Sequence, residues 1–251
     1  NQVEAALFAG EKPGFVYTRI GNPTVAMWER RVAELETRGT GVEAAALAFA
    51  TGMGAISATI LAAVSTGDHV VGMAPLYGGT SELFANLLPR LGIRATVVAP
   101  GDMVALEQVA QQPRTRVVLI ETPGNPTMDI VDIRRSAQIA HAAGARLYVD
   151  NTFATPILQQ PFALGADVVL HSATKYLGGH GTVVSGVAVA RDLEFLAGPV
   201  SEMRKLLGAA PGPFDAWLLL QGVKTLELRM ERMIRTAEGL ARILAAHEMV
   251  E

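Results

Sequence analysis

Short apolar runs rich in Val, Ile and Leu alternate along this chain with longer segments in which apolar residues recur at helical spacing. The runs with strand character cover residues 45–50, 69–73, 95–99, 117–121, 147–150, 168–171 and 187–190. The segments with helical spacing cover residues 25–36, 55–64, 80–91, 103–111 and 133–143. Strands that alternate with helices pair mostly in parallel and are covered on both faces. The pattern therefore predicts an α/β fold with three α/β/α layers around a mostly parallel sheet.

The pattern changes after about residue 213, where the strands cease. Apolar residues then recur at helical spacing through Leu226, Met230 and Ile234, which predicts a long helix that leads out of the sheet domain. The first residues show no helix signal. We therefore expect an N-terminal arm over residues 1–23 and an α/β domain over 24–225. A connecting helix over 226–251 would begin a C-terminal domain beyond the sequence given.

One uncharged stretch, residues 44–64, is about as long as a membrane-spanning helix. Small residues, among them Thr51, Gly52 and Gly54, divide it into a strand-like half and a helix-like half. It also lacks an aromatic belt and a flanking cationic cluster. The stretch is therefore predicted to be a buried strand, turn and helix.

The composition of the chain argues against several classes of partner and of functional site. The chain of 251 residues carries 21 Lys and Arg against 24 Asp and Glu, is 50% hydrophobic and contains no cysteine. A net charge of −3 gives no reason to expect a nucleic acid or a membrane surface as partner. The absence of cysteine excludes disulfides, thiolate metal sites and a cysteine nucleophile, and favours a cytoplasmic location. The first residues show no secretory signal, and Asn1 in place of Met indicates that sequence precedes it.

Metal-assisted and triad hydrolysis find no support in the sequence. The five histidines show no close ligand spacing, so no metal site is predicted. Ser172 and Ser185 lack the context of a nucleophile elbow.

Ligands of open parallel sheets bind beyond the carboxyl ends of the strands, so the residues after each apolar run are the informative ones. Gly52 and Met53 follow the first run and open a helix, where backbone N–H groups and the helix dipole favour an anion such as phosphate. A tight turn that needs glycine is the alternative.

Two residues with charged side chains follow later runs. Lys175 lies beside the hydroxyls of Ser172 and Thr174, where its amine could form a Schiff base with a carbonyl cofactor while the hydroxyls bind a phosphate. Asp150 ends a run, where its carboxylate needs a cationic partner such as a protonated pyridine nitrogen. The alternatives are a solvated lysine and a turn or helix-capping aspartate.

Four further residues are candidates for contacts with a flat cofactor. The ring of Tyr77 could stack on it, and Asn125 could bond a ring hydroxyl. Tyr17 and Arg19 precede the first helix, where an arm could present the arginine to a phosphate. A packing tyrosine and an ordinary turn asparagine are the alternatives.

Seven motifs occur in an order that resembles the Cys/Met-metabolism family of pyridoxal-phosphate enzymes. This family includes cystathionine γ-synthase, cystathionine γ-lyase, methionine γ-lyase and O-acetylhomoserine sulfhydrylase. The resemblance covers nearly the whole chain and implies the type I fold of aspartate aminotransferase. The motifs are YTRIGNPT (17–24), TGMGA (51–55), LYGGT (76–80), ETPGNP (121–126), VDNT (149–152), HSATKYL (171–177) and GVKTLELRM (222–230).

The resemblance implies a role for each candidate residue. Lys175 would hold pyridoxal 5'-phosphate covalently and shuttle protons, Asp150 would pair with the pyridine nitrogen, and Tyr77 would stack on the ring and assist the leaving group. The phosphate would be bound by Gly52, Met53, Ser172 and Thr174, joined by Tyr17 and Arg19 from a neighbouring subunit, while Asn125 would lie near the ring hydroxyl. The implied assembly is a homotetramer built from dimers with shared active sites.

The implied reaction removes the Cα proton and then a Cβ proton of an amino-acid substrate and expels its γ-substituent. We expect a C–S lyase that acts on cystathionine, methionine or homocysteine and yields 2-oxobutanoate and ammonia. The alternative is γ-replacement on an O-acylhomoserine. Gly79 stands where methionine γ-lyases usually carry cysteine, whereas Tyr176 after the lysine resembles the lyase branches. A non-catalytic α/β binding protein and a dinucleotide-dependent oxidoreductase are the alternatives from other classes.

Overall fold

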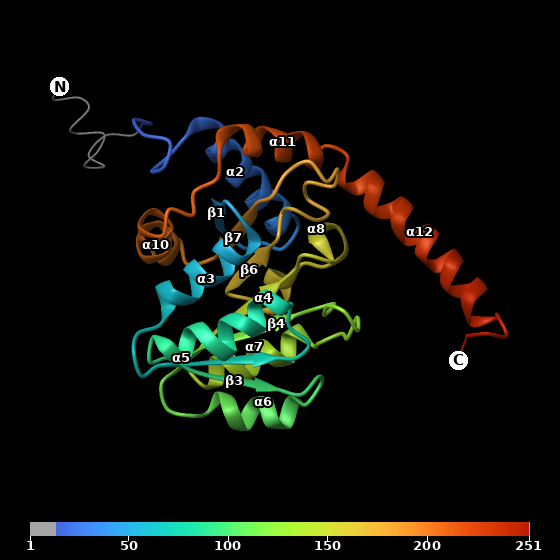
Figure 1. Ribbon diagram of the computed structural model, residues 1–251, viewed down its shortest axis with the longest axis horizontal. Helices are drawn as coiled ribbons and strands as arrows, with labels where there is room; N and C mark the ends of the chain where they lie inside the picture. The colour runs from blue at the N-terminus through green and yellow to red at the C-terminus, as the bar shows by residue number, and fades with distance from the viewer. Residues whose placement is uncertain (1–13, 251) are drawn as a thin grey trace.

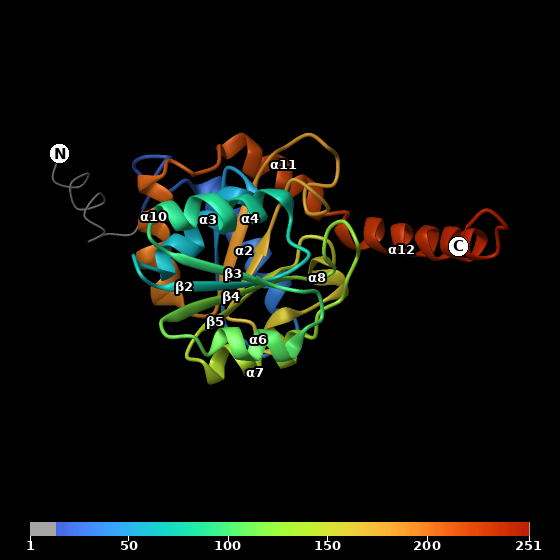
Figure 2. The ribbon, with the colours of Figure 1, turned by 60° about the horizontal axis from the view of Figure 1, so that its bottom comes forward.

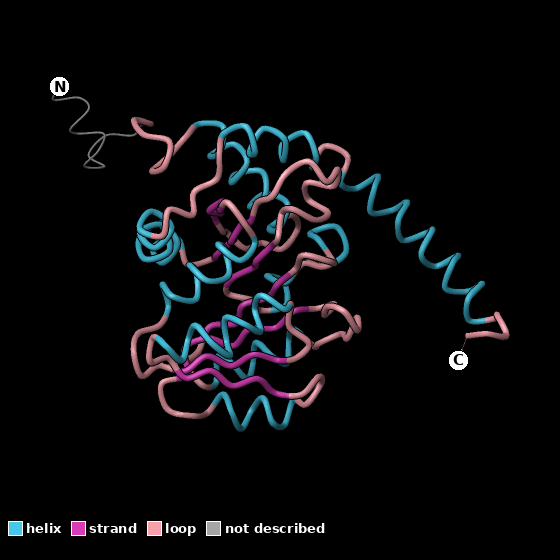
Figure 3. The backbone as a smooth tube through the Cα atoms, viewed as in Figure 1, coloured by secondary structure: helices cyan, strands magenta, loops and turns pink. Residues whose placement is uncertain are grey.

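The computed structural model describes residues 14–250 and contains a seven-stranded sheet in the order β1-β7-β6-β5-β4-β2-β3. Strands β2 to β6 pair in parallel, whereas β7 runs antiparallel to both β1 and β6. The predicted mostly parallel sheet is therefore confirmed. Figure 3 shows its strands side by side between the helices. The strands are β1 Ala45–Phe49, β2 His69–Met73, β3 Arg94–Val98, β4 Thr115–Glu121, β5 Arg146–Asp150, β6 Val168–His171 and β7 Gly186–Ala190.

Helices cover both faces of the sheet, as the alternating pattern predicted. Figure 2 shows α3 and α4 on one side of the strands and α6 and α7 on the other. The first helices are α2 Pro23–Thr37, α3 Gly52–Ala63, α4 Gly78–Glu82, a π-helical segment Leu83–Leu87, α5 Leu88–Arg90, α6 Met103–Ala110 and α7 Ile133–Ala142. The later ones are α8 Thr155–Leu158, a 3-10 turn Pro161–Leu164, α9 Leu193–Phe195, a π-helical segment Leu196–Val200, α10 Ser201–Leu206, α11 Pro213–Val223 and α12 Leu226–Ala245.

Two separate hydrophobic cores hold the three layers together. Alternate residues of β4 point to opposite faces, so Val118 and Ile120 belong to one core while Val117 and Leu119 belong to the other. The first core also contains the fully buried Trp28 of α2. Burial on both faces explains why the strands are continuous apolar runs rather than alternating ones.

The uncharged stretch 44–64 forms β1 and α3, which confirms the predicted strand, turn and helix. Among residues 14–250, no helix combines the length and the hydropathy that crossing a membrane requires. The sequence pattern missed the helical segment from α9 to α10. A short α-helix precedes a π-helical segment that contains Pro199, and this irregularity removes a regular helical period.

A hydrogen bond holds the backbone just before α2 against α10 of the same chain. Arg204 of α10 is buried and donates hydrogen bonds to Glu29 Oε1 (2.8 Å), to the Ala48 carbonyl (3.1 Å) and to the Ile20 carbonyl (3.2 Å). Asn22 then caps α2 by accepting a bond from the amide of Thr24. Most of the predicted arm, residues 1–13, lies outside the described residues, so its extent stays a prediction.

The helical stretch predicted after residue 213 contains two helices, α11 and α12, because the chain turns at residues 224–225. α11 packs against α2, and α12 extends away from the sheet (Figure 1). The start of α12 at Leu226 matches the predicted start of a connecting helix. The division of the chain into domains nevertheless stays a prediction.

The turn between β1 and α3 is held by very close contact with β7. Gly186 pairs with Phe49, and a Cβ atom at this glycine would lie 2.2 Å from the carbonyl oxygen of Thr51. The preceding residue, Ser185, donates its hydroxyl to the Phe49 carbonyl at 2.8 Å. Only glycine at position 186 therefore lets the turn lie against β7.

We predict that Gly186→Ala lowers the free energy of unfolding by about 1–3 kcal/mol, since the added methyl must push backbone atoms apart. The matched control is Gly198→Ala, whose Cβ would meet no atom within 4 Å. The control should leave stability unchanged or raise it slightly. Urea denaturation of both variants measures the difference, and equal stabilities would contradict the close contact at Thr51.

Candidate active site

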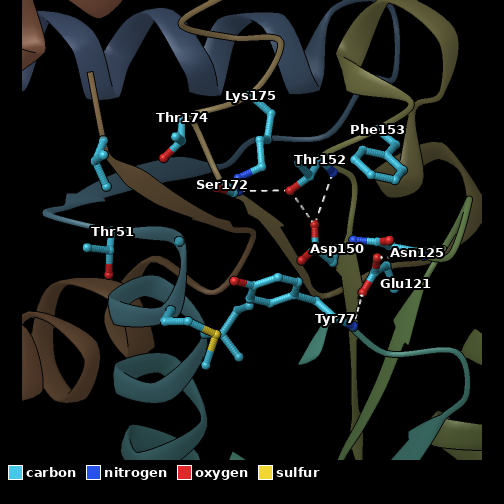
Figure 4. A pocket seen from close by; sticks show the side chains of 14 residues that line it. Thr51, Tyr77, Glu121, Asn125, Asp150, Thr152, Phe153, Ser172, Thr174 and Lys175 are labelled. Carbon is cyan, nitrogen blue, oxygen red and sulfur yellow. Dashed lines mark hydrogen bonds between the residues drawn. The ribbon is translucent and has the colours of Figure 1, made fainter. Parts of the chain in front are cut away.

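A cavity of about 290 Å³ opens beyond the carboxyl ends of the parallel strands. The segments that follow β1, β2, β4, β5 and β6 each contribute to its wall, and Figure 4 shows their side chains around one space. Eight of the ten residues predicted as site residues line it. The lining consists of Thr51, Gly52, Met53, Ile56, Tyr77, Glu121, Asn125, Asp150, Thr152, Phe153, Ser172, Thr174, Lys175 and Val184.

The N-terminus of α3 forms one end of the cavity. Thr51 caps this helix, since its hydroxyl accepts a hydrogen bond from the Gly54 amide at 2.8 Å. The amides of Gly52 and Met53 are in the first turn, where helical N–H groups have no partner within the helix. Gly52 lies so close to Ser172 that a Cβ atom would be 2.8 Å from the Ser172 Cβ. This end therefore combines backbone N–H groups, a helix dipole and a hydroxyl, which together suit an anion.

Asp150, the last residue of β5, brings a buried carboxylate to the cavity. Its Oδ1 accepts bonds from the amide (3.0 Å) and the hydroxyl (2.5 Å) of Thr152, and that hydroxyl in turn accepts the amide of Ser172 at 2.8 Å. Burial nevertheless raises the pKa of Asp150 above its ordinary value. A cation in the cavity would therefore stabilise the ionised form.

Lys175 follows β6 in a loop that is tied to the segment before β7. The Lys175 amide donates to the Ser172 carbonyl at 3.1 Å. The hydroxyl of Thr174 both donates to the Ser185 carbonyl and accepts the Ser185 amide, each at 3.1 Å. The backbone around the lysine is thus fixed, and its side chain points into the space between Thr174 and Thr152 in Figure 4.

Glu121, the last residue of β4, was not predicted as a site residue. It pairs in register with Asp150 on the adjacent strand, and its carboxylate accepts the amides of Tyr77 (2.8 Å) and Asn125 (3.0 Å). Burial, and then the neighbouring carboxylate of Asp150, raise the pKa of Glu121 to about 7. The signal that could have identified it is the one used for Asp150, an acidic residue at the end of a buried strand.

A second missed feature lies behind the cavity. Nε2 of His171, the last residue of β6, lies 2.5 Å from Oε1 of Glu36 in α2, and both side chains are fully buried. The same oxygen accepts a bond from the Asn151 side chain at 3.0 Å. Positive charge on His171 would counteract the rise in the pKa of Asp150. The helical spacing of α2 gave no hint that Glu36 points inward.

Tyr17 and Arg19 are the two predicted residues that do not line the cavity. The Arg19 guanidinium donates to the Lys205 carbonyl at 3.1 Å and lies 5.1 Å from the centre of the Tyr17 ring. Both residues are exposed. Their predicted contribution to a neighbouring subunit's site stays a prediction.

The chemistry of the cavity wall fits pyridoxal phosphate. The wall offers an anion-binding helix terminus, a buried carboxylate that gains from a cationic partner, a lysine amine and the exposed ring of Tyr77. Pyridoxal phosphate has a phosphate, a basic ring nitrogen, an aldehyde and a flat ring that match these groups one by one. A Cβ atom at position 52 would collide with Ser172, so only glycine fits at the anion-binding end.

Comparisons with known proteins agree with this fit. The family model described as Cys/Met metabolism PLP-dependent enzyme matches residues 1–251. The chain is 43% identical to an L-methionine gamma-lyase of Porphyromonas gingivalis over 97% of its own length and 60% of the relative's. It is 44% identical to a cystathionine gamma-synthase of Mycobacterium bovis over 96% of its length and 60% of the relative's.

A solved structure shows the same fold. The crystal structure of metB from Corynebacterium glutamicum superposes with a TM-score of 0.89 at 39% identity, and the match covers 96% of this chain and 60% of that one. The chain thus spans about 60% of the length of the curated relatives it matches.

We predict a pH-dependent loss of stability that originates at Glu121. Between its ordinary pKa of 4.5 and its pKa of about 7 in the fold, the folded protein holds a proton that the unfolded chain releases. The free energy of unfolding should therefore fall as the pH rises through this interval. Glu121→Gln lacks this titrating group. Its free energy of unfolding should therefore rise relative to that of wild type between about pH 5 and about pH 8. Urea denaturation of cofactor-free protein measures this difference, and a difference independent of pH would contradict the assignment.

Proposed function

This chain belongs to the Cys/Met-metabolism family of PLP-dependent enzymes, and we propose that its protein is a C–S lyase that catalyses γ-elimination on a sulfur amino acid. The substrates proposed are cystathionine, methionine or homocysteine, and the products are 2-oxobutanoate and ammonia. The observation that carries the proposal is the arrangement of Lys175 and Asp150. Asp150 ends β5, Lys175 follows the adjacent strand β6, and both line one cavity whose other end is the N-terminus of α3.

Residues of this chain would hold the cofactor at each of its functional groups. The amides of Gly52 and Met53, with the hydroxyls of Ser172 and Thr174, would bind the phosphate. Asp150 would hold a proton on the ring nitrogen, because the buried carboxylate is stabilised by that positive charge. Pyridoxal phosphate, when bound, supplies an aldehyde that condenses with amines and a ring that withdraws electrons from the substrate's α-carbon.

Two side chains would then act on the substrate. Lys175, once a substrate amine has taken its place, would accept the proton from Cα and move protons at Cβ, since its loop is fixed beside the cavity. Tyr77 would pack against the ring and donate its hydroxyl proton to the departing γ-substituent. Asn125 would bind the ring hydroxyl.

The second candidate function is γ-replacement on an O-acylhomoserine, catalysed by a γ-synthase or sulfhydrylase. Sequence identity does not separate the two, since a gamma-lyase and a gamma-synthase match at 43% and 44%. Both reactions need the same residues to reach the point at which the γ-substituent has left. Access of a thiol, or of water, to the cavity then determines the product.

The assembly and location belong to the same proposal. We propose a cytoplasmic homotetramer in which Tyr17 and Arg19 reach the phosphate of a neighbouring subunit. The exposure of both residues outside their own chain's cavity is compatible with such sharing. The absence of cysteine supports a reducing compartment.

We predict that Lys175→Ala folds but loses turnover by at least about 10²-fold, because both the covalent attachment and the proton transfer depend on its amine. Borohydride reduction of the wild-type holoenzyme should attach the cofactor to the peptide that contains Lys175, as measured by mass spectrometry. Lys224→Ala is the control, since this exposed amine bonds only its neighbour Gln221 in the described structure. Full activity of Lys175→Ala would overturn the assignment.

A product analysis separates the two candidate functions. The full-length protein with pyridoxal phosphate is offered methionine, cystathionine, O-acetylhomoserine and O-succinylhomoserine, each with and without an added thiol. We expect 2-oxobutanoate from a thioether substrate without thiol. A thioether product that forms only from an O-acylhomoserine together with a thiol would instead establish γ-replacement.

A further inference from the structure

The carboxylate of Glu121 joins the two loops that carry Tyr77 and Asn125. One oxygen, Oε2, accepts the Tyr77 amide at 2.8 Å, and the other, Oε1, accepts the Asn125 amide at 3.0 Å. Figure 4 shows the bond to the Tyr77 backbone below the carboxylate of Asp150. The two amides belong to the residues whose side chains line the cavity, so the carboxylate fixes the backbone from which the ring and the side-chain amide project.

The two loops also touch directly at this point. A Cβ atom at Gly124 would lie 2.4 Å from Cγ of Pro75, so the backbone of one loop rests against the proline ring of the other. The Glu121 carboxylate bridges the same junction from the side of the sheet. Hydrogen bonds to an ionised acceptor are stronger than those between neutral groups, so both bonds of the bridge strengthen when Glu121 is ionised.

A buried carboxylate beside a second one is energetically unfavourable, which argues against a packing role alone. Glu121 is only 8% exposed and lies beside Asp150, and burial and the neighbouring charge both disfavour its ionised form. A neutral side chain would fill the space without that cost. A side chain with two acceptor oxygens is needed where two backbone amides must be held at once.

We propose that Glu121 is a positioning residue that holds Tyr77 and Asn125 against the ring of the bound cofactor, an inference that rests on the proposed function. It acts through the backbone of both residues and has no part in proton transfer. Its loss should therefore loosen the two loops together and leave the Lys175 loop, which is tied to Ser185, unchanged.

Hydrogen exchange of the full-length protein tests the bridge without any turnover. In wild type, the amides of Tyr77 and Asn125 should exchange more slowly than those of the exposed Gly78 and Thr127, as resolved by mass spectrometry with electron-transfer fragmentation. In Glu121→Gln, exchange should rise in residues 76–80 and 123–127 and stay constant in 172–178. The side-chain amide can accept only one of the two bonds, because its NH₂ group faces the other donor.

The holoenzyme provides the second readout. Glu121→Gln should lower the circular dichroism of the cofactor band per bound cofactor, since the stacked tyrosine is less fixed, and should lower kcat by about 10- to 100-fold. The control is Glu82→Gln in neighbouring α4, whose exposed side chain bonds only Asn86 in the described structure and should leave all readouts unchanged.

The outcomes distinguish this inference from the proposed function. A wild-type protein that binds no pyridoxal phosphate would overturn the proposed function and, with it, the role of the bridge. In a protein that binds the cofactor, unchanged exchange in both loops of Glu121→Gln would overturn the bridge alone. If Glu121→Gln does not fold, fast exchange of the Tyr77 and Asn125 amides in wild type would overturn it equally.

Discussion

The burial of the Asp150 carboxylate at the end of β5 is the constraint on which the site depends. A charge in this position is unfavourable unless donors and a cation surround it. Thr152 supplies two donors, and the hydroxyl of Thr152 also fixes the backbone of Ser172 after β6. The bonds that satisfy the carboxylate thereby position the loop that leads to Lys175.

The opposite end of the cavity depends on backbones that approach without side chains between them. Gly186 of β7 lies against Thr51, and Gly52 lies against Ser172. The two contacts fix the start of α3 relative to β7 and to the end of β6, so the helix dipole is aimed at the cavity that the strands open. The sheet therefore determines the distance between the anion-binding end and Asp150, and the loops add the side chains.

Much of this could be predicted from the sequence, since strands buried on both faces appear as apolar runs and the residues after them form the site. Asp150, Lys175 and Gly52 were predicted as candidates in this way, and all three line the cavity. Glu36 was not, because a single acidic residue in an amphipathic helix looks solvated until its partner His171, which is distant in sequence, is placed beside it. The connecting helix was predicted to begin at residue 226, where α12 begins, but α11 was not predicted as a separate helix.

The two ends of the cavity also differ in charge, a feature that appears only when the strands are placed side by side. Glu121 and Asp150 end adjacent strands and pair in register, so two acidic groups share one end. The N-terminus of α3 carries partial positive charge at the other end. A ligand that is stabilised by both carries positive charge at one end and negative charge at the other. The phosphate and the basic ring nitrogen of pyridoxal phosphate meet that condition, whereas a neutral or wholly anionic ligand would add no positive charge beside the paired carboxylates.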